Sequence, residues 1–359
     1  MKLGNRLNRF VLALLALTIL RPTAWSQDAI PDPDGKPADM SKPVQVYILM
    51  GQSNMLGFGK ISAAPEKEEG TLSNAVNNKQ LYPYLIDDSG AWTERKDVRN
   101  VRVMGSGTKA GRVVHNEWLT INNRKIGPEV GIGHYLGNAI DAPVLILKSC
   151  IGNRSLGWDL LPPGSPAFDF EEKGTVWNYA GYKESPLRWE KGTEPEPIGW
   201  YAGMQYDGDI ANAKRILSEL DKYYPGANSY EIAGFFFWQG DKDRYNAGHA
   251  SRYEQNLVQL IQQLRKDFDA PNAKFVCATL GQTEKGAEGN EGMILEGQLA
   301  VDGTTGKYQQ FKGNVATVYS HPLSKGGASN GHYSGNAETY MNIGEAMGKA
   351  MVDLLGSAK

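Results

Sequence analysis

Five apolar runs that break at small or polar residues recur along this chain of 359 residues. They cover residues 44–50, 143–149, 231–238, 274–280 and, more weakly, 315–319. Runs this short and this apolar are typical of strands that are buried on both faces of a sheet. Amphipathic helices are predicted between them, one from about Ser251 and one at the C-terminus from Tyr340 to Leu354. The alternation predicts a three-layer α/β/α fold around a mainly parallel sheet of five strands.

The carboxyl ends of the predicted strands indicate where a ligand would bind. In doubly wound, flavodoxin-like sheets ligands lie beyond the ends of the parallel strands, in the loops that follow them. Here those loops are residues 51–55, 150–157, 239–243 and 281–282. Candidate functional residues are therefore sought in these four segments.

The N-terminus has the order of a secretory signal peptide. Basic Lys2, Arg6 and Arg9 precede the apolar run 10–20, and small residues follow as far as Ser26. We expect a cleaved signal at residues 1–26 and a secreted or periplasmic protein; an uncleaved N-terminal anchor is the alternative. Residues 27–43, rich in Pro and Asp, are predicted to be a flexible lead-in.

The mature chain is predicted to be one domain, residues 44–359. Long polar or aromatic insertions interrupt it at about 60–125 and 152–206. Without the signal it has 34 basic and 40 acidic residues, and no clustered basic stripe, which argues against a nucleic-acid partner. No later segment is long and apolar enough to predict a membrane span. The sequence gives no indication of the oligomeric state.

Two cysteines are present, Cys150 and Cys277, both late in predicted strands. If the strands at 143–149, 231–238 and 274–280 are neighbours in that order, the two residues lie two strands apart, roughly 9–10 Å. That separation is too long for a disulfide. We expect two buried, free thiols.

Ser53 is the leading candidate for a nucleophile. It lies just past the first buried strand in a Gly-containing turn, a geometry that lifts a hydroxyl above the sheet edge and directs backbone N–H groups toward it. Residues 48–55 (ILMGQSNM) resemble the first motif of the SGNH hydrolases, in the form found in sialate O-acetylesterases and carbohydrate acetylesterases. A structural helix cap is the ordinary alternative for a serine in a turn.

Further motifs of that family follow in the expected order. Residues 127–129 (GPE) resemble its G-P-E segment, 149–152 (SCIG) its second motif, and 237–243 (FWQGDKD) its W-x-Q-G-E-S-D stretch, while His332 stands where the catalytic histidine belongs. The resemblance spans about residues 44–355. It implies that His332 is the general base, with His321 as its rival, and that Ser53, Gly152 and Gln239 form the oxyanion hole.

The acid is where the sequence departs from the family pattern. SGNH enzymes usually carry an aspartate three residues before the histidine, and here that position is Ser329. Asp243, which aligns with the last acid of the family stretch, is the first choice for the carboxylate of the triad, and Asp241 is the alternative. A dyad without an acid is the third possibility.

The remaining site assignments concern the substrate. Gln52 and Asn54, which flank Ser53, are assigned to substrate binding, together with Arg154 for a polar or anionic sugar group and Trp158 for the apolar face of a sugar ring. Packing of the insertion is the ordinary alternative for its tryptophans. No metal or cofactor is predicted, because the histidines lack ligand spacing and Gly57-Phe58-Gly59 lacks the third glycine of a dinucleotide site.

Three functions remain open. The favoured one is a carboxylic ester hydrolase, an O-acetylesterase that acts on an acetylated poly- or oligosaccharide through an acyl-enzyme. A lipase or thioesterase of the same superfamily would need an apolar groove for an acyl chain. A non-catalytic carbohydrate-binding relative is favoured by the missing aspartate and opposed by the intact Ser53 and His332.

Overall fold

The computed structural model describes Met1 and residues 37–122 and 124–356. The expected signal peptide, residues 1–26, falls almost entirely outside the described residues, as does most of the expected lead-in. Within the described ranges no helix is long and apolar enough to cross a membrane.

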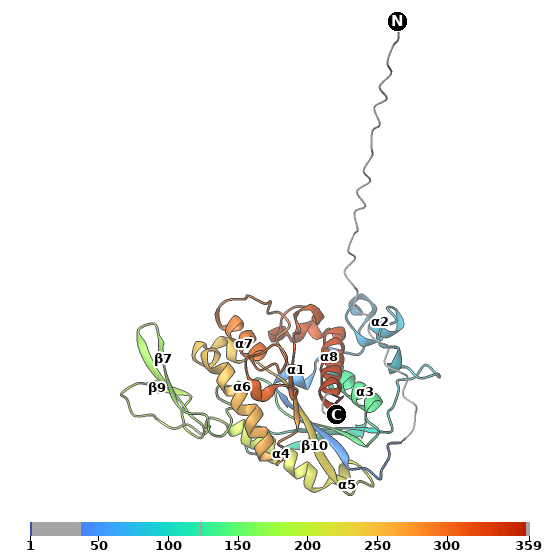
Figure 1. Cartoon of the computed structure of the whole chain (residues 1–359), viewed down its shortest axis with the longest axis horizontal. Helices are drawn as coiled ribbons and strands as arrows, with labels where there is room; N and C mark the ends of the chain where they lie inside the picture. Colours follow the sequence, from blue (N-terminus) through green and yellow to red (C-terminus); the bar gives the residue numbers. More distant parts are fainter. Residues whose placement is uncertain (2–36, 123, 357–359) are drawn as a thin grey trace.

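A seven-stranded sheet forms the centre of the molecule, in the order β12-β11-β10-β1-β6-β3-β4 (Figure 1). Every neighbouring pair is parallel except β3 and β4, which are antiparallel. Its strands, from one edge to the other, are β12 (Val315–Val318), β11 (Lys274–Ala278), β10 (Tyr230–Trp238), β1 (Val44–Gly51), β6 (Val144–Ser149), β3 (Val98–Met104) and β4 (Arg112–Trp118).

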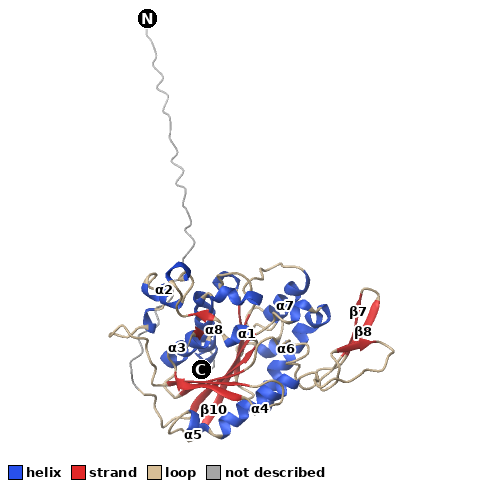
Figure 2. Cartoon of the chain, turned by 180° about the vertical axis from the view of Figure 1, so that it is seen from behind, coloured by secondary structure: helices blue, strands red, loops and turns tan. Residues whose placement is uncertain are grey.

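Helices cover both faces of the sheet because its central strands are apolar on both. Along β1, Val46 and Ile48 belong to one buried cluster and Tyr47 and Leu49 to the other. The first cluster includes side chains of α4 (Met204–Ser218), α5 (Leu220–Tyr223), α6 (Ala247–Asp267) and α7 (Gly289–Ala300). The second includes side chains of α1 (Ser53–Leu56), α2 (Leu72–Asn77), α3 (Glu129–Ala139) and α8 (Ala337–Gly356). The expected three-layer α/β/α architecture is therefore confirmed (Figures 1 and 2).

The sheet is wider than the sequence predicts. All five predicted strands are present, and β3 and β4 extend the sheet from within the segment 60–125 that was expected to be an insertion. The strand order also corrects one assumption. The strand β1 lies between β6 and β10, so Cys150, which follows β6, and Cys277, which lies in β11, belong to strands three positions apart rather than two. Both thiols are free and buried, as expected.

The second insertion forms a small sheet of its own. The strands β7 (Phe168–Glu172), β8 (Thr175–Tyr179) and β9 (Arg188–Glu190) pair antiparallel and project from the body of the molecule (Figure 2). A separate two-stranded sheet is formed by β2 (Gly59–Lys60), which pairs antiparallel with β5 (Lys125–Ile126). These two short strands bring the segment after Ser53 against the segment before the G-P-E motif.

Candidate active site

Ser53 is held at the carboxyl end of β1 by a turn that requires glycine. Gly51 has a φ of +142°, and a Cβ added to it would lie 2.4 Å from the backbone oxygen of Trp238. Only glycine permits this close approach of β1 to the end of β10. Ser53 then begins α1 and remains 8% exposed. Its backbone N–H, as the first of a helix, has no acceptor within the helix and is available to a ligand.

Gly152 lies directly beside Ser53, as the resemblance predicts. A Cβ added to Gly152 would lie 3.7 Å from the Cβ of Ser53 and 3.7 Å from a terminal carbon of Leu56. The loop after β6 therefore runs along α1. Two of the three expected oxyanion donors, the backbone N–H groups of Ser53 and Gly152, belong to adjacent segments.

His332 is presented by the turn Ser329–Gly335, called here the His332 turn. His332, Tyr333 and Ser334 all have left-handed backbone angles, with φ between 51° and 54°. Three consecutive non-glycine residues in this region are uncommon, and such strain is typical of functional sites. The turn contacts α1, and the side-chain amide of Asn54 donates to the hydroxyl of Tyr333 at 3.4 Å. Ser53 and His332 are thus carried by adjoining elements.

The charge of Asp241 favours the protonated form of His332. Burial lowers the pKa of the His332 imidazole, the charge of Asp241 raises it, and the charge of Lys125 lowers it, with a net pKa below the ordinary value. Asp241 accepts a hydrogen bond of 2.5 Å from the hydroxyl of Ser329 and one of 2.9 Å from Nε of Arg244. Ser329, which replaces the usual aspartate, therefore joins the His332 turn to a carboxylate from the end of β10.

Asp243, the first-choice acid, lies elsewhere. It is fully buried, and its two oxygens accept hydrogen bonds of 2.8 Å from the backbone N–H groups of Leu156 and Gly157. The amide of Gln239 adds a third bond of 2.5 Å. Burial raises the pKa of Asp243 to about 6. No hydrogen bond joins Asp243 to His332 within the described residues, so the structure gives this carboxylate a different role from the expected one: it holds the loop after β6.

Gln239 is likewise engaged by the protein. Its amide nitrogen donates to Oε1 of Gln52 at 3.1 Å and to the backbone oxygen of Arg154 at 3.0 Å, in addition to Asp243. An amide nitrogen has two hydrogens, so this arrangement leaves none for an oxyanion. The expected donor role of Gln239 is not what the geometry favours; Gln239 instead links the ends of β1, β6 and β10.

Gln52 and Asn54 also differ from their expected substrate-binding role. Gln52 is 1% exposed, and its side-chain oxygen accepts from Gln239 and from the backbone N–H of Lys242. Asn54 is fully buried and contacts Tyr333. Both side chains point into the protein on either side of Ser53 and fix the turn.

Trp158 and Trp200, both in the second insertion, lie in different surroundings. Trp158 is 8% exposed and packs with Leu161, Ala180 and Ala202 in the core of the insertion, which is the ordinary alternative noted for such residues. The Arg154 guanidinium lies 5.0 Å from the ring centre of the half-buried Trp200 and donates 3.0 Å to the Ser106 hydroxyl. Trp200 is one of four tryptophans of this insertion that the sequence offers for a substrate contact; Trp158 was the first choice because it closely follows Gly152 in the chain.

The family model described as "Carbohydrate esterase, sialic acid-specific acetylesterase" matches residues 185–353. Residues 185–353 are therefore similar to that carbohydrate esterase family. The resemblance inferred from the sequence is confirmed, and so is the enzyme class, a carboxylic ester hydrolase. The match contains Gln239, Asp241, Asp243 and His332, whereas Ser53 and Gly152 precede it.

Three solved structures are similar to this chain. A protein of Arabidopsis thaliana has 16% sequence identity and a TM-score of 0.48, with 86% of this chain and 98% of that chain covered. A carbohydrate acetylesterase from Xanthomonas citri has 14% identity and a TM-score of 0.46, with 85% of this chain and 55% of that chain covered. NanS has 15% identity and a TM-score of 0.34, with 67% and 68% covered. This chain thus spans about half the length of the Xanthomonas citri protein. No curated protein matches it by sequence.

A buried ion pair lies behind α1, the short helix that begins at Ser53. Lys148, 1% exposed and in the middle of the sheet, has its Nζ 2.5 Å from Oε2 of Glu129 and donates 3.2 Å to the backbone oxygen of Leu56, the last residue of α1. Burial lowers the pKa of Lys148 and the Glu129 charge opposes the change. The pair was not predicted from the sequence, although a lysine inside the apolar run 143–149 indicates that a buried acidic partner is required.

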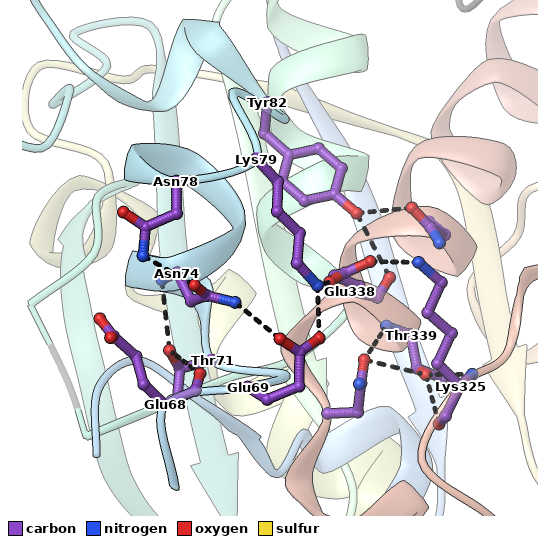
Figure 3. Close-up of polar contacts among 12 residues, drawn as sticks. Glu68, Glu69, Thr71, Asn74, Asn78, Lys79, Tyr82, Lys325, Glu338 and Thr339 are labelled. Carbon is purple, nitrogen blue, oxygen red and sulfur yellow. Dashed lines mark hydrogen bonds and ion pairs between the residues drawn. The ribbon is translucent and has the colours of Figure 1, made fainter. Parts of the chain in front are cut away.

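A second ionic cluster anchors the chain just after His332. Glu338, 1% exposed at the start of α8, is bridged by Lys79 at 2.6 Å and also pairs with Lys325. Figure 3 shows Lys79 reaching from the α2 segment to both Glu69 and Glu338. The backbone N–H of Ala337 donates 2.7 Å to the oxygen of Gly70. The first insertion thereby fixes the start of α8, and with it the end of the His332 turn.

Metal ligands were not predicted, and no group of three or more candidate ligands occurs in residues 37–122 or 124–356.

The rival base His321 lies outside the group around Ser53: its Nδ1 is 3.0 Å from the backbone oxygen of Gly281 and its Nε2 is 3.4 Å from Glu284. The geometry thus favours His332 as the base.

Proposed function

We propose that this chain is a serine esterase that removes O-acetyl groups from a carbohydrate. The observation that carries the proposal is the grouping at one sheet edge of Ser53, Gly152 alongside it, and the His332 turn against α1. In an acyl transfer, the Ser53 hydroxyl attacks the acetyl carbonyl and its proton passes to His332. The sugar oxygen leaves with that proton, and water then releases acetate from Ser53 in the second half of the reaction.

Two backbone N–H groups would stabilise the negative charge that develops on the carbonyl oxygen. Those of Ser53 and Gly152 are our candidates, and loss of one such donor costs roughly 3–4 kcal/mol of transition-state stabilisation in other serine hydrolases. Asp241 is our acid. Its charge favours the imidazolium form of His332, which is the form that exists after the proton transfer. The hydrogen bond from Ser329 fixes one oxygen of this carboxylate.

For the substrate, we propose that the loop bearing Arg154 and the ring of Trp200 contact the sugar. Both side chains are half-buried and stacked, so they offer a flat apolar surface beside a cation. The acid-sugar specificity printed in the family description would match that cation. Arg154→Lys should raise KM for an anionic acetylated sugar and leave KM for 4-nitrophenyl acetate unchanged. Arg188→Lys is the matched control, because Arg188 stacks on Trp177 in the projecting sheet.

The decisive experiment compares wild type with Ser53→Ala. Wild type should hydrolyse 4-nitrophenyl acetate and release acetate from at least one member of a panel of acetylated polysaccharides, and the variant should do neither while folding normally. Equal rates in the two proteins would refute the proposal and favour the carbohydrate-binding alternative. Hydrolysis confined to long-chain acyl esters would favour the lipase alternative.

We further propose that the protein is exported and acts outside the cytoplasm, on the basis of the N-terminal sequence pattern. Expression of the full chain followed by fractionation and an intact-mass measurement tests this. The expected product lacks about the first 26 residues; a full-length, cell-retained product would contradict it.

A further inference from the structure

The segment Gly57-Phe58-Gly59 passes very close to two neighbouring segments of the chain. Gly57 has a φ of +91°, and a Cβ added to it would lie 2.2 Å from the Cα of Gly127. A Cβ on Gly59 would lie 3.1 Å from the Cα of Ala337, at the start of α8. The two glycines let the chain pass between the G-P-E turn and α8. Phe58, between them, is delivered to the His332 turn.

The Phe58 ring lies flat on the His332 imidazole. The two ring centres are 3.9 Å apart and the planes are 6° from parallel. No hydrogen bond to the imidazole occurs within the described residues, so this stacking is the contact that fixes the plane of the ring. Lys125, from β5, lies over the Phe58 ring with its Nζ 4.4 Å from the centre.

We propose that Phe58 is a positioning residue for the catalytic base His332. This inference rests on the proposed function, and it explains how the base is oriented when the usual aspartate is replaced by Ser329. Stacking uses the face of the imidazole and leaves both nitrogens, on the ring edge, free for Ser53 and for the acid. A hydrogen-bonded aspartate in the His332 turn would have fixed the ring through one nitrogen instead.

The charged groups around His332 come from several elements. Asp241 follows β10, and Lys125 belongs to β5. Lys60, from β2, lies against Gly335 of the His332 turn, where a Cβ would be 2.9 Å from its Cε. Phe58 shields one face of the imidazole from water, and burial is the main cause of its lowered pKa. Removing the ring should therefore raise the pKa of His332 toward its ordinary value, and removing the Lys125 charge should raise it too.

The test uses Phe58→Leu, Phe58→Tyr and Lys125→Met. Phe58→Leu should lower kcat for 4-nitrophenyl acetate by about two- to ten-fold, the range expected for loss of one aromatic stack, with little change in KM. The acidic limb of its pH–rate profile should move to higher pH. Phe58→Tyr keeps the ring and should restore kcat. Lys125→Met should move the limb in the same direction and leave kcat at high pH unchanged.

A control and an activity-independent measurement complete the experiment. Phe168→Leu is the matched control. Phe168, in the projecting sheet, also stacks on an aromatic ring, that of Tyr179 at 5.0 Å, and has a cation, Arg252 of α6, over its ring. This variant should leave both kcat and the pH–rate profile unchanged. NMR titration of the His332 ring, assigned with His332→Gln, reports its pKa in the folded protein without any substrate.

The outcomes separate the two proposals. If Ser53→Ala abolishes hydrolysis while Phe58→Leu has wild-type kcat and an unmoved His332 pKa, the positioning role of Phe58 is refuted and the esterase proposal stands. If Ser53→Ala is fully active, the esterase proposal is refuted, and the NMR titration still decides whether Phe58 controls the environment of His332. A loss of kcat in Phe58→Tyr as large as in Phe58→Leu would also overturn the inference.

Discussion

Replacing Lys148 with methionine tests whether the ion pair behind α1 supports the nucleophile. Lys148 and Glu129 are almost fully buried and 2.5 Å apart. Methionine would leave the Glu129 carboxylate with the backbone N–H of Gly127, at 3.1 Å, as its remaining hydrogen-bond donor. It would also remove the donor to the backbone oxygen of Leu56. Both changes act on the element that carries Ser53.

The expected cost follows from burial. Breaking one partner of a buried ion pair typically costs about 3–5 kcal/mol, because an uncompensated charge remains in a medium of low polarity. Glu129→Gln keeps an acceptor for Gly127 but leaves the Lys148 ammonium as the uncompensated buried charge, so a cost of the same order, about 3–5 kcal/mol, is expected. In Lys148→Met/Glu129→Gln no buried charge remains. The double variant should therefore be more stable than the sum of the two single costs implies, by roughly 0.5–3 kcal/mol.

Urea unfolding followed by tryptophan fluorescence measures these free energies, and kcat for 4-nitrophenyl acetate reports on α1. Lys148→Met should lose activity under conditions where it is still folded. Lys191→Met is the control: Lys191 and Asp169 are also 2.5 Å apart but lie exposed on the projecting sheet, where such pairs add little stability. Additive costs in the double variant, or equal stability of the Lys148→Met and Lys191→Met proteins, would refute the reasoning.

Four further substitutions test the other parts of the site. Gly152→Ala should leave stability unchanged, because its Cβ meets only ordinary contacts at 3.7 Å, yet lower kcat at least about ten-fold by filling the space beside Ser53; unchanged kinetics would contradict this. Asp241→Asn should lower kcat roughly 10²-fold or more, whereas Asp243→Asn should chiefly lower the free energy of unfolding, by about 1–3 kcal/mol; the reverse pattern would restore Asp243 as the acid. For Glu338, burial raises the pKa, but the bonds from its two lysines outweigh burial and hold the pKa below the ordinary value. The contribution of Glu338 to stability is thus present above that ordinary pKa and is lost as pH falls through the folded-state pKa. Glu338→Gln should therefore flatten the acid limb of a curve of Tm against pH. An unchanged curve would argue against a stabilising role for the Glu338–lysine cluster.

The strands that could be predicted are the buried ones whose sequences are continuous apolar runs. The two that were expected to be part of an insertion, β3 and β4, have mixed sequences, with only a weak strand signal at residues 101–104. In β3, Arg99 and Asn100 are buried within the sheet, with Arg99 Nε donating 2.9 Å to the backbone oxygen of Tyr223. An edge strand such as β4 is half-exposed along its length. The buried polar groups of such strands form hydrogen bonds with residues far away in the sequence. The periodicity of a single sequence does not reveal those partners.

The same limit explains the site. Ser53, Gly152 and His332 could be located because each follows from a strand end or from a motif in the order of the family. The choice between Asp241 and Asp243 could not, because a single residue, Lys242, separates a carboxylate that meets the His332 turn from one that meets the loop after β6.

The position of the acid follows from what each segment has to hold. The loop after β6 needs an acceptor for two consecutive backbone N–H groups, and Asp243 supplies it; this loop carries Gly152 to Ser53. We propose that the His332 turn needs a negative charge near the imidazole. Ser329 stands in place of an aspartate, so in this proposal the charge comes from Asp241, which the Ser329 hydroxyl holds by a hydrogen bond. One turn after β10 thus supplies a carboxylate to each side of Ser53. Asp241→Asn should therefore act through the base and lower kcat, whereas Asp243→Asn should act through the loop after β6 and chiefly lower the free energy of unfolding.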